Sequence, residues 1–139
     1  MINNYKDILK NCKQGVCTFS AMDKLSLQTS SIPNGYGVYI ICANTPEGEI
    51  LYIGKSGTLE KDGTYKEQNL RERINNKQGG KKRQIFFKEI LDSDPSLKKL
   101  VIKWFIVDEK KILPAYVEAC LMQEYFEKKG KLPCLNKSF

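Results

Sequence analysis

Hydrophobic residues recur along the first half of the chain with two different periods. Between residues 2 and 12 they fall at helical spacing among Asn and Lys, which predicts a short amphipathic helix. Two later runs, YGVYIICA (36–43) and EILYIG (49–54), are rich in β-branched and aromatic residues. Five residues, NTPEG, join these runs and include Pro and Gly, a pattern typical of a β-hairpin.

The second half of the chain contains three helical patterns and one further strand. NLRERINN (69–76) predicts a short helix, and KKRQIFFKEILDSD (81–94) predicts a longer one that ends before Pro95. LVIKWFIV (100–107) is apolar enough to be a central strand, and residues 113–130 form a strongly helical segment. The polar segment between the hairpin and the first of these helices, GTLEKDGTYKEQ, is expected to be a loop.

These elements predict a small α+β domain. Their order is helix, hairpin, helix, helix, strand, helix, which favours a three-stranded, mostly antiparallel sheet flanked by helices. The sequence between residues 13 and 34 has no clear period and ends in the turn-rich SSIPNG. We therefore predict one domain over residues 1–139, with 1–33 as an N-terminal helical extension.

Charge favours a polyanionic partner. The chain has 23 Lys and Arg against 16 Asp and Glu, a net charge of +7, and each phosphate that such a protein neutralises releases counterions. Within the run KQGGKKRQ we predict that four cations contact a nucleic-acid backbone: Lys77, Lys81, Lys82 and Arg83. A basic protein without such a partner, with this run as a solvated loop, is the alternative.

The absence of histidine restricts the chemistry. With no histidine and five cysteines that form no close CxxC pair, a zinc site is disfavoured and a Ser-His-Asp triad is excluded. Free thiols and the absence of a signal-like N-terminal pattern predict a cytoplasmic protein. No apolar run approaches the ~18 residues of a membrane-spanning helix, so no membrane association is expected.

The tripeptide Gly54-Lys55-Ser56 suggests a phosphate-binding loop. That loop, G-x-x-x-x-G-K-[ST], needs a glycine five positions before Gly54, where this chain has Glu49; Gly48 is one residue too far. The intervening residues are strand formers, and a carboxylate would be unfavourable in an anion cradle. The spacing therefore argues against a nucleoside triphosphatase.

Two other tripeptides in the hairpin resemble a known signature. Gly37-Val38-Tyr39 and Tyr52-Ile53-Gly54 lie on the two predicted strands and resemble the GIY-YIG motifs of a nuclease family. The resemblance continues in order over about residues 33–136, most of the chain. NLRERI resembles the family's helix with a catalytic arginine, YVEACLMQEYF the helix with a metal-binding glutamate, and LPCLN a closing motif with asparagine; the matching residues are Arg73, Glu118 and Asn136.

The resemblance implies a metal-dependent endonuclease that hydrolyses phosphodiester bonds in DNA, with RNA as the alternative substrate. Glu118 would hold one Mg²⁺ or Mn²⁺, and Arg73 would stabilise the growing charge on the phosphate. We favour Tyr39 as the base, although a free phenol has a pKa near ~10 that Arg73, Lys55 or the metal would have to lower. The remaining expected site residues are Tyr52 and Lys55, which position water and phosphate, and Asn136, which maintains the geometry.

The chain departs from the family pattern in three places. Val38 replaces isoleucine, the polar segment 57–68 lengthens the path to the arginine helix, and Lys77 stands where many members have histidine or tyrosine. Glu124 is a rival metal ligand, but the Leu-Met pair three residues after Glu118 follows the family order.

Two alternatives to the enzyme remain. One is a catalytically inactive nucleic-acid-binding module with the same fold, and the other is an unrelated phosphate-binding protein. The intact Tyr, Tyr, Arg, Glu, Asn set favours the enzyme. Members of the family often carry a separate DNA-binding module, and we expect that here specificity comes from the domain's own surface, a homodimer or a partner protein.

Overall fold

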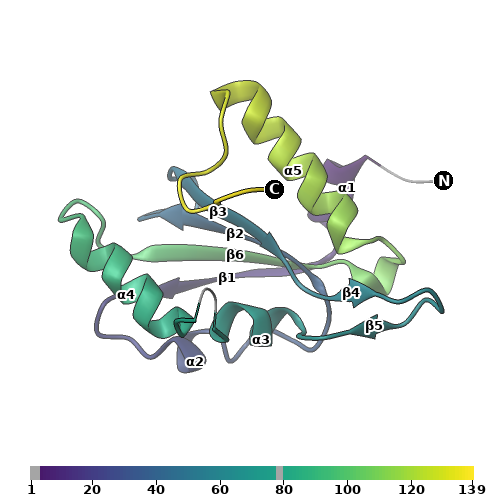
Figure 1. Cartoon of the computed structure of the whole chain (residues 1–139), viewed down its shortest axis with the longest axis horizontal. Helices are drawn as coiled ribbons and strands as arrows, with labels where there is room; N and C mark the ends of the chain where they lie inside the picture. The colour runs from purple at the N-terminus through teal and green to yellow at the C-terminus, as the bar shows by residue number, and fades with distance from the viewer. Residues whose placement is uncertain (1–3, 78–79) are drawn as a thin grey trace.

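A four-stranded sheet forms the middle layer of the protein, with helices on both faces (Figure 1). The computed structural model describes residues 4–77 and 80–139. The strand order is β1-β6-β2-β3, and every neighbouring pair is antiparallel. The strands are β1 (Lys13–Phe19), β2 (Gly37–Ala43), β3 (Ile50–Lys55) and β6 (Leu100–Ile106). The predicted α+β class is confirmed.

The helices divide between the two faces of the sheet. On one face lie α1 (Tyr5–Asn11) and α5 (Pro114–Lys129), and on the other lie α2 (Leu25–Gln28), α3 (Leu70–Asn75) and α4 (Arg83–Ser93) (Figure 1). A 3₁₀ turn, η1 (Asp108–Lys110), follows β6. No helix among the described residues is long and apolar enough to cross a membrane.

Local signals in the sequence account for the helix ends. The Asn69 side chain accepts from the amide of Glu72, whose carboxylate accepts from the amide of Asn69, so a complete capping box starts α3. Helix α5 begins with Pro114 and ends at Gly130, whose φ of 68° is left-handed. The helices predicted from these segments are confirmed.

Strand β1 is a correction to the sequence analysis. It lies in the segment treated as a helical extension, and it pairs with β6 from Lys13↔Ile106 to Phe19↔Leu100, so the sheet has four strands instead of three. A Cβ at Gly15 would lie 2.5 Å from the Trp104 ring, which occupies the space of a side chain there. Only Cys17 and Phe19 of this strand are buried, and so the alternation is too short to detect.

The polar segment predicted as a loop contains a small hairpin. Strands β4 (Thr58–Leu59) and β5 (Tyr65–Lys66) pair through two residues each. Tyr65 stacks on Tyr36 with ring centroids 4.6 Å apart, which fastens the hairpin to the main sheet.

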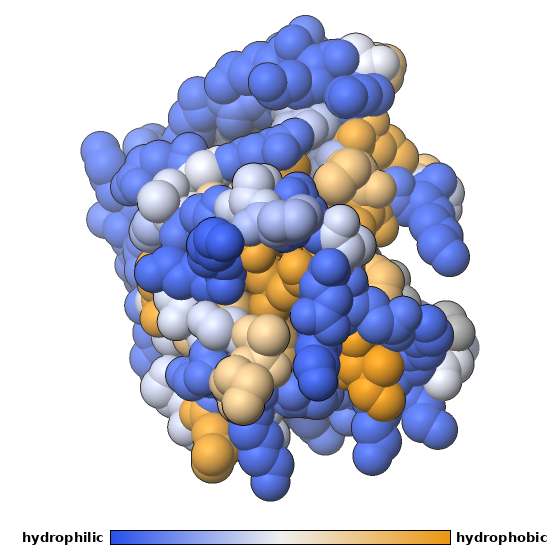
Figure 2. All heavy atoms as spheres, turned by 90° about the vertical axis from the view of Figure 1, so that its left-hand side faces the viewer, coloured by the Kyte–Doolittle hydropathy of each residue, from blue (hydrophilic) through white to orange (hydrophobic). Residues whose placement is uncertain are grey.

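The surface is largely polar. Figure 2 shows that hydrophilic residues cover most of the face that lies at the left of Figure 1, and that the apolar areas on it are separated. Some large apolar side chains are nevertheless exposed, such as Met22 and Phe139.

Close backbone and ring contacts explain both glycines of the paired motifs. A Cβ at Gly37 would collide with the carbonyl oxygen of Phe105 on β6. A Cβ at Gly54 would lie 2.6 Å from the Tyr52 ring and 2.8 Å from the Tyr39 ring. Any side chain at either position would push neighbouring groups apart.

We predict that Gly54→Ala destabilises the protein by about 1–3 kcal/mol, because its methyl group overpacks two buried rings. Urea unfolding measures this change. Gly63→Ala is the control, because a Cβ at Gly63 has no atom within 4 Å. This variant is destabilised only by the left-handed backbone at that position, where φ is 86°. A Gly54→Ala protein at least as stable as wild type would contradict the packing argument.

Candidate functional site

A polar pocket lies at the C-terminal end of β3. It encloses about 180 Å³ and is lined by Tyr52, Lys55, Ser56, Gly57, Thr58, Glu67, Gln68, Arg73 and Glu118. Four of the residues predicted to be catalytic are in this set. The structure therefore brings Tyr52, Lys55, Arg73 and Glu118 together, although they are far apart in the sequence.

Three elements supply these four side chains. Tyr52 and Lys55 come from β3, Arg73 from the last turn of α3, and Glu118 from the beginning of α5. Because α3 and α5 cover opposite faces of the sheet, their side chains can meet only around its rim. The pocket forms at the rim where β3, an edge strand, ends.

Glu118 is a half-buried acid of the pocket. Burial raises the pKa of its carboxyl group above the usual range, while the positive charges of Lys55 and Arg73 act in the opposite direction. Desolvation is the larger effect. A cation bound beside Glu118 would favour its ionised form.

Ser56 has a structural role at the end of β3. Its hydroxyl accepts from the amide of Gly37 at 3.1 Å, and its own amide donates to the Gly37 carbonyl at 3.0 Å. The side chain is 2% exposed. Lys55 lines the same pocket, and its ammonium group donates to the Gly57 carbonyl at 3.4 Å.

Glu67 and Gln68 are among the pocket residues that the sequence analysis missed. They follow the β4–β5 hairpin, and Glu67 has a left-handed φ of 71°. The hydroxyl of Thr58 donates to the Glu67 carboxylate at 3.2 Å, which holds this acid against the hairpin. Their placement depends on the hairpin fold, and no motif in the polar segment indicates it.

The pocket could hold a divalent cation only with help from outside the protein. Glu118 and Glu67 are the carboxylates of its lining, and the described residues contain no cluster of three or more His, Cys, Asp or Glu suited to a metal. Mg²⁺ usually keeps several waters and takes one or two carboxylates together with substrate phosphate oxygens. The residues present fit that kind of site.

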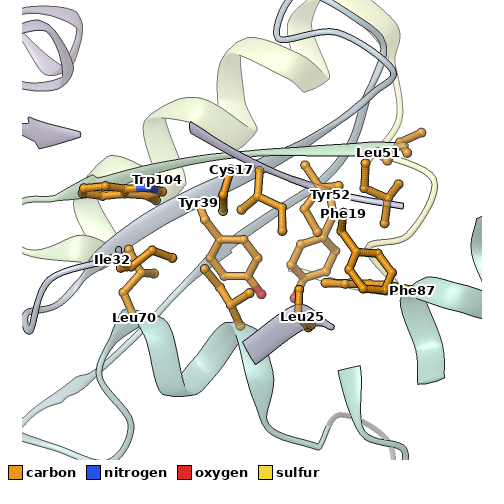
Figure 3. Packing of buried hydrophobic residues seen from close by; sticks show 14 of the residues in the cluster. Cys17, Phe19, Leu25, Ile32, Tyr39, Leu51, Tyr52, Leu70, Phe87 and Trp104 are labelled. Atoms are coloured by element: carbon orange, nitrogen blue, oxygen red, sulfur yellow. The ribbon is translucent and has the colours of Figure 1, made fainter. Parts of the chain in front are cut away.

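Tyr39 lies beneath the pocket and does not line it. Its side chain is 0% exposed, and its ring centroid lies 5.7 Å from that of Tyr52. Figure 3 shows both rings extending from the sheet into the apolar core. Burial raises the pKa of Tyr39 far above its usual value, although the neighbouring charge of Arg83 acts to lower it. The structure thus argues against Tyr39 as the base; of the two tyrosines, Tyr52 is the one that lines the pocket.

Arg83 is a second correction, because it does not belong to the exposed basic run. It is 1% exposed, and its Nη2 donates to the Tyr39 hydroxyl at 2.9 Å. The guanidinium carbon lies 6.0, 5.4 and 5.6 Å from the ring centroids of Tyr39, Tyr52 and Phe87. Its Nε and Nη1 have no hydrogen-bond partner within the described part of the chain.

The spacing of residues along α4 indicates that Arg83 is buried. Arg83, Phe87 and Leu91 are the buried residues of α4, and they are spaced four apart. An arginine that continues an apolar stripe in this way lies on the buried face of the helix, whatever the charge of its neighbours.

The other cations of the predicted run also have different environments. Lys81 pairs with Glu89 at 2.9 Å and is thereby partly neutralised. Lys77 and Lys82 line a separate hollow. The four predicted contacts do not form one continuous patch.

Asn136 closes the outer edge of β3. Its side-chain oxygen accepts from the Ile53 amide at 3.0 Å, and its side-chain nitrogen donates to the Ile53 carbonyl at 3.0 Å. The Leu135 amide adds a bond to the Leu51 carbonyl at 2.9 Å. Asn136 therefore replaces the peptide group of a missing neighbouring strand, and it positions Tyr52 without lining the pocket.

Glu124, the rival metal ligand, lies outside the pocket. Its carboxylate accepts from the hydroxyl of Tyr5 and pairs with Lys6 at 3.2 Å, which fastens α1 to α5. The Tyr5 hydrogen bond is the largest contribution to lowering the pKa of Glu124. The structure favours Glu118 over Glu124 as the acid of the site.

We predict that Asn136→Ala lowers the free energy of unfolding by about 1–3 kcal/mol, because it removes two hydrogen bonds from an edge strand. Chemical denaturation measures the change. Lys137→Ala, which alters an exposed neighbour, serves as the control and should be nearly neutral. Equal stability of the two variants would show that the amide does not support β3.

We also predict that folded Tyr39 stays protonated through pH 11. The absorbance of tyrosinate should then rise equally for wild type and Tyr39→Phe up to that pH. In denaturant the two should differ by one group near pH ~10. Because only the unfolded chain releases this proton, stability should fall as the pH rises above ~10. A proton lost from folded Tyr39 below pH 10 would instead indicate a phenolate paired with Arg83.

Comparisons with protein-family models, with curated proteins and with solved structures find no match for this chain. The nuclease resemblance therefore rests on the motifs themselves and on the pocket in which four of their residues meet.

Proposed function

We propose that the protein is a metal-dependent endonuclease of the GIY-YIG type that hydrolyses phosphodiester bonds in DNA. The observation that carries the proposal is the meeting of Tyr52, Lys55, Arg73 and Glu118 in one polar pocket of about 180 Å³. These residue types match the needs of phosphodiester hydrolysis, in which a water is activated and charge on phosphoryl oxygens is stabilised.

The two cations of the pocket are suited to the phosphate. Arg73 carries a permanent charge on a planar fork of donors, which matches two phosphoryl oxygens as their charge grows. Lys55 provides a compact charge from the edge strand, and its bond to the Gly57 carbonyl fixes its direction. Together they would orient the phosphate against the acids of the pocket.

Glu118 would hold the Mg²⁺ or Mn²⁺ ion, with Glu67 as the second carboxylate within the same lining. When bound, such an ion supplies positive charge next to the phosphate oxygens and favours a deprotonated water. Burial alone favours the neutral form of Glu118, whereas the positive charges of Lys55 and Arg73, and a cation bound beside it, favour the ionised form that binds metal.

We assign the role of base to Tyr52, because of the two tyrosines it is the one whose residue lines the pocket. Tyr39 acts as a positioning residue. Its ring packs against that of Tyr52, and its hydroxyl is held by Arg83. Asn136 holds the same strand from the opposite, outer side.

We predict that Arg73→Ala lowers the rate of plasmid nicking in Mg²⁺ or Mn²⁺ by about 10²-fold or more, as expected for a group that stabilises transition-state charge. Arg71→Ala is the matched control, since Arg71 lies on the same helix but donates to the Ser30 carbonyl outside the pocket. Glu118→Gln should abolish the metal-dependent rate, while Glu127→Gln, an exposed position on the same helix α5, should not.

Two results would overturn these assignments. Nicking that survives both Arg73→Ala and Glu118→Gln would place the active site elsewhere. Wild-type protein that binds DNA but cleaves it with neither metal would favour the binding module over the enzyme.

A further inference from the structure

A second, larger hollow adjoins the candidate pocket. It encloses about 700 Å³, within the ~300–1,000 Å³ range of small-molecule sites. Its walls come from the start of α2, the end of α3 and the start of α4. Gln68 lines both the hollow and the pocket, so the two spaces are neighbours.

The hollow is positively charged. Lys24, Lys77 and Lys82 line it, and its lining contains no Asp or Glu. The ion pairs within 4.0 Å between described residues involve other lysines, such as Lys81, so the charges of these three are available to a ligand. Lys24 was missed by the sequence analysis because it is far from the basic run along the chain and joins it only in the fold.

Carboxamide side chains lie among these lysines. Gln84 is fully used within the protein, since it accepts from the Leu25 amide at 2.6 Å and donates to the Asp23 carbonyl at 3.0 Å. It forms a fixed wall between α2 and α4.

The other carboxamides retain hydrogen-bonding capacity. Asn75 uses its nitrogen for the Thr29 hydroxyl and the Arg71 carbonyl, each at 2.8 Å, and keeps its oxygen. No hydrogen bond between described residues involves the side chain of Gln68 or Asn76. Amides of this kind pair with the edges of nucleobases, adenine above all.

We propose that the hollow receives one unpaired nucleotide next to the phosphodiester held in the candidate pocket. The inference rests on the proposed function, and it specifies the substrate: DNA with an unpaired or extruded nucleotide at the site of cleavage. A base within a continuous duplex offers only its groove edges and cannot enter a concave site, whereas an unstacked nucleotide can. The lysines neutralise its flanking phosphates, and the amides contact its base.

Binding to matched DNAs tests this inference. Wild-type protein in EDTA, where the metal-dependent reaction cannot proceed, is titrated with a continuous duplex and with the same duplex carrying one unpaired adenosine. We expect about tenfold or tighter binding to the second DNA. A third DNA, in which the unpaired residue is abasic, should lose that preference.

Substitutions separate the two kinds of contact. Lys24→Gln with Lys82→Gln should weaken binding to every DNA and lower the slope of log affinity against log salt by about 2. Lys81→Gln is the matched control, because Lys81 is already paired with Glu89. Asn76→Ala should reduce the preference for the unpaired adenosine and leave the salt slope unchanged, a combination that simple destabilisation would not produce.

Three results would overturn the inference. The first is equal affinity for the continuous duplex and the duplex with an unpaired adenosine. The second is binding to the abasic DNA as tight as to the unpaired adenosine. The third is a double lysine variant that binds DNA like Lys81→Gln. Cleavage in Mg²⁺ or Mn²⁺ is scored separately. Preferential binding without cleavage would reject the proposed function but support the hollow as a nucleotide site. Cleavage without preferential binding would reject only the assignment of the hollow.

Discussion

Strand β2 lies between β6 and β3, and both of its faces are buried. Tyr39 and Ile41 pack toward α2, α3 and α4, while Val38 and Ile40 pack toward α5 and α1. A strand buried in this way must approach its neighbours closely, and Gly37 allows the approach to β6. The pairing of β2 with β3 has a fixed register, and this register sets the positions of Tyr52 and Lys55 relative to the pocket.

The contact between Arg83 and Tyr39 places a permanent charge within this apolar core. No carboxylate lies within ion-pair distance of Arg83 among the described residues, so three aromatic rings and one phenol replace the usual counter-ion. Removing a cation from water costs free energy unless polar or aromatic groups surround it. We therefore expect Arg83 to have a role that an apolar residue could not fill. Here it fixes the hydroxyl of Tyr39 and joins α4 to the strand beneath the site.

Local patterns predicted most of the fold because they depend on neighbouring residues. Caps, the hairpin and the period of α5 were all visible, and the register of the motifs led to the four pocket residues. Strand β1 was not visible in the sequence, because the Trp104 ring fills the space beside Gly15. A glycine at that position interrupts the alternation of apolar and polar residues. Arg83, Lys24 and Glu67 were misassigned or missed for a related reason: their roles are set by residues far away along the chain, which no single segment reveals.

The edge of β3 is completed by a side chain that follows it by 83 residues. An edge strand without a neighbour exposes unpaired amides and carbonyls, which invite pairing with other chains. During synthesis the outer edge of β3 therefore stays unpaired until Asn136 has been added, although the neighbouring strand β2 is already made. The pocket that depends on β3 would be among the last parts of the domain to become ordered, and the nascent chain would be most prone to aggregation before that point.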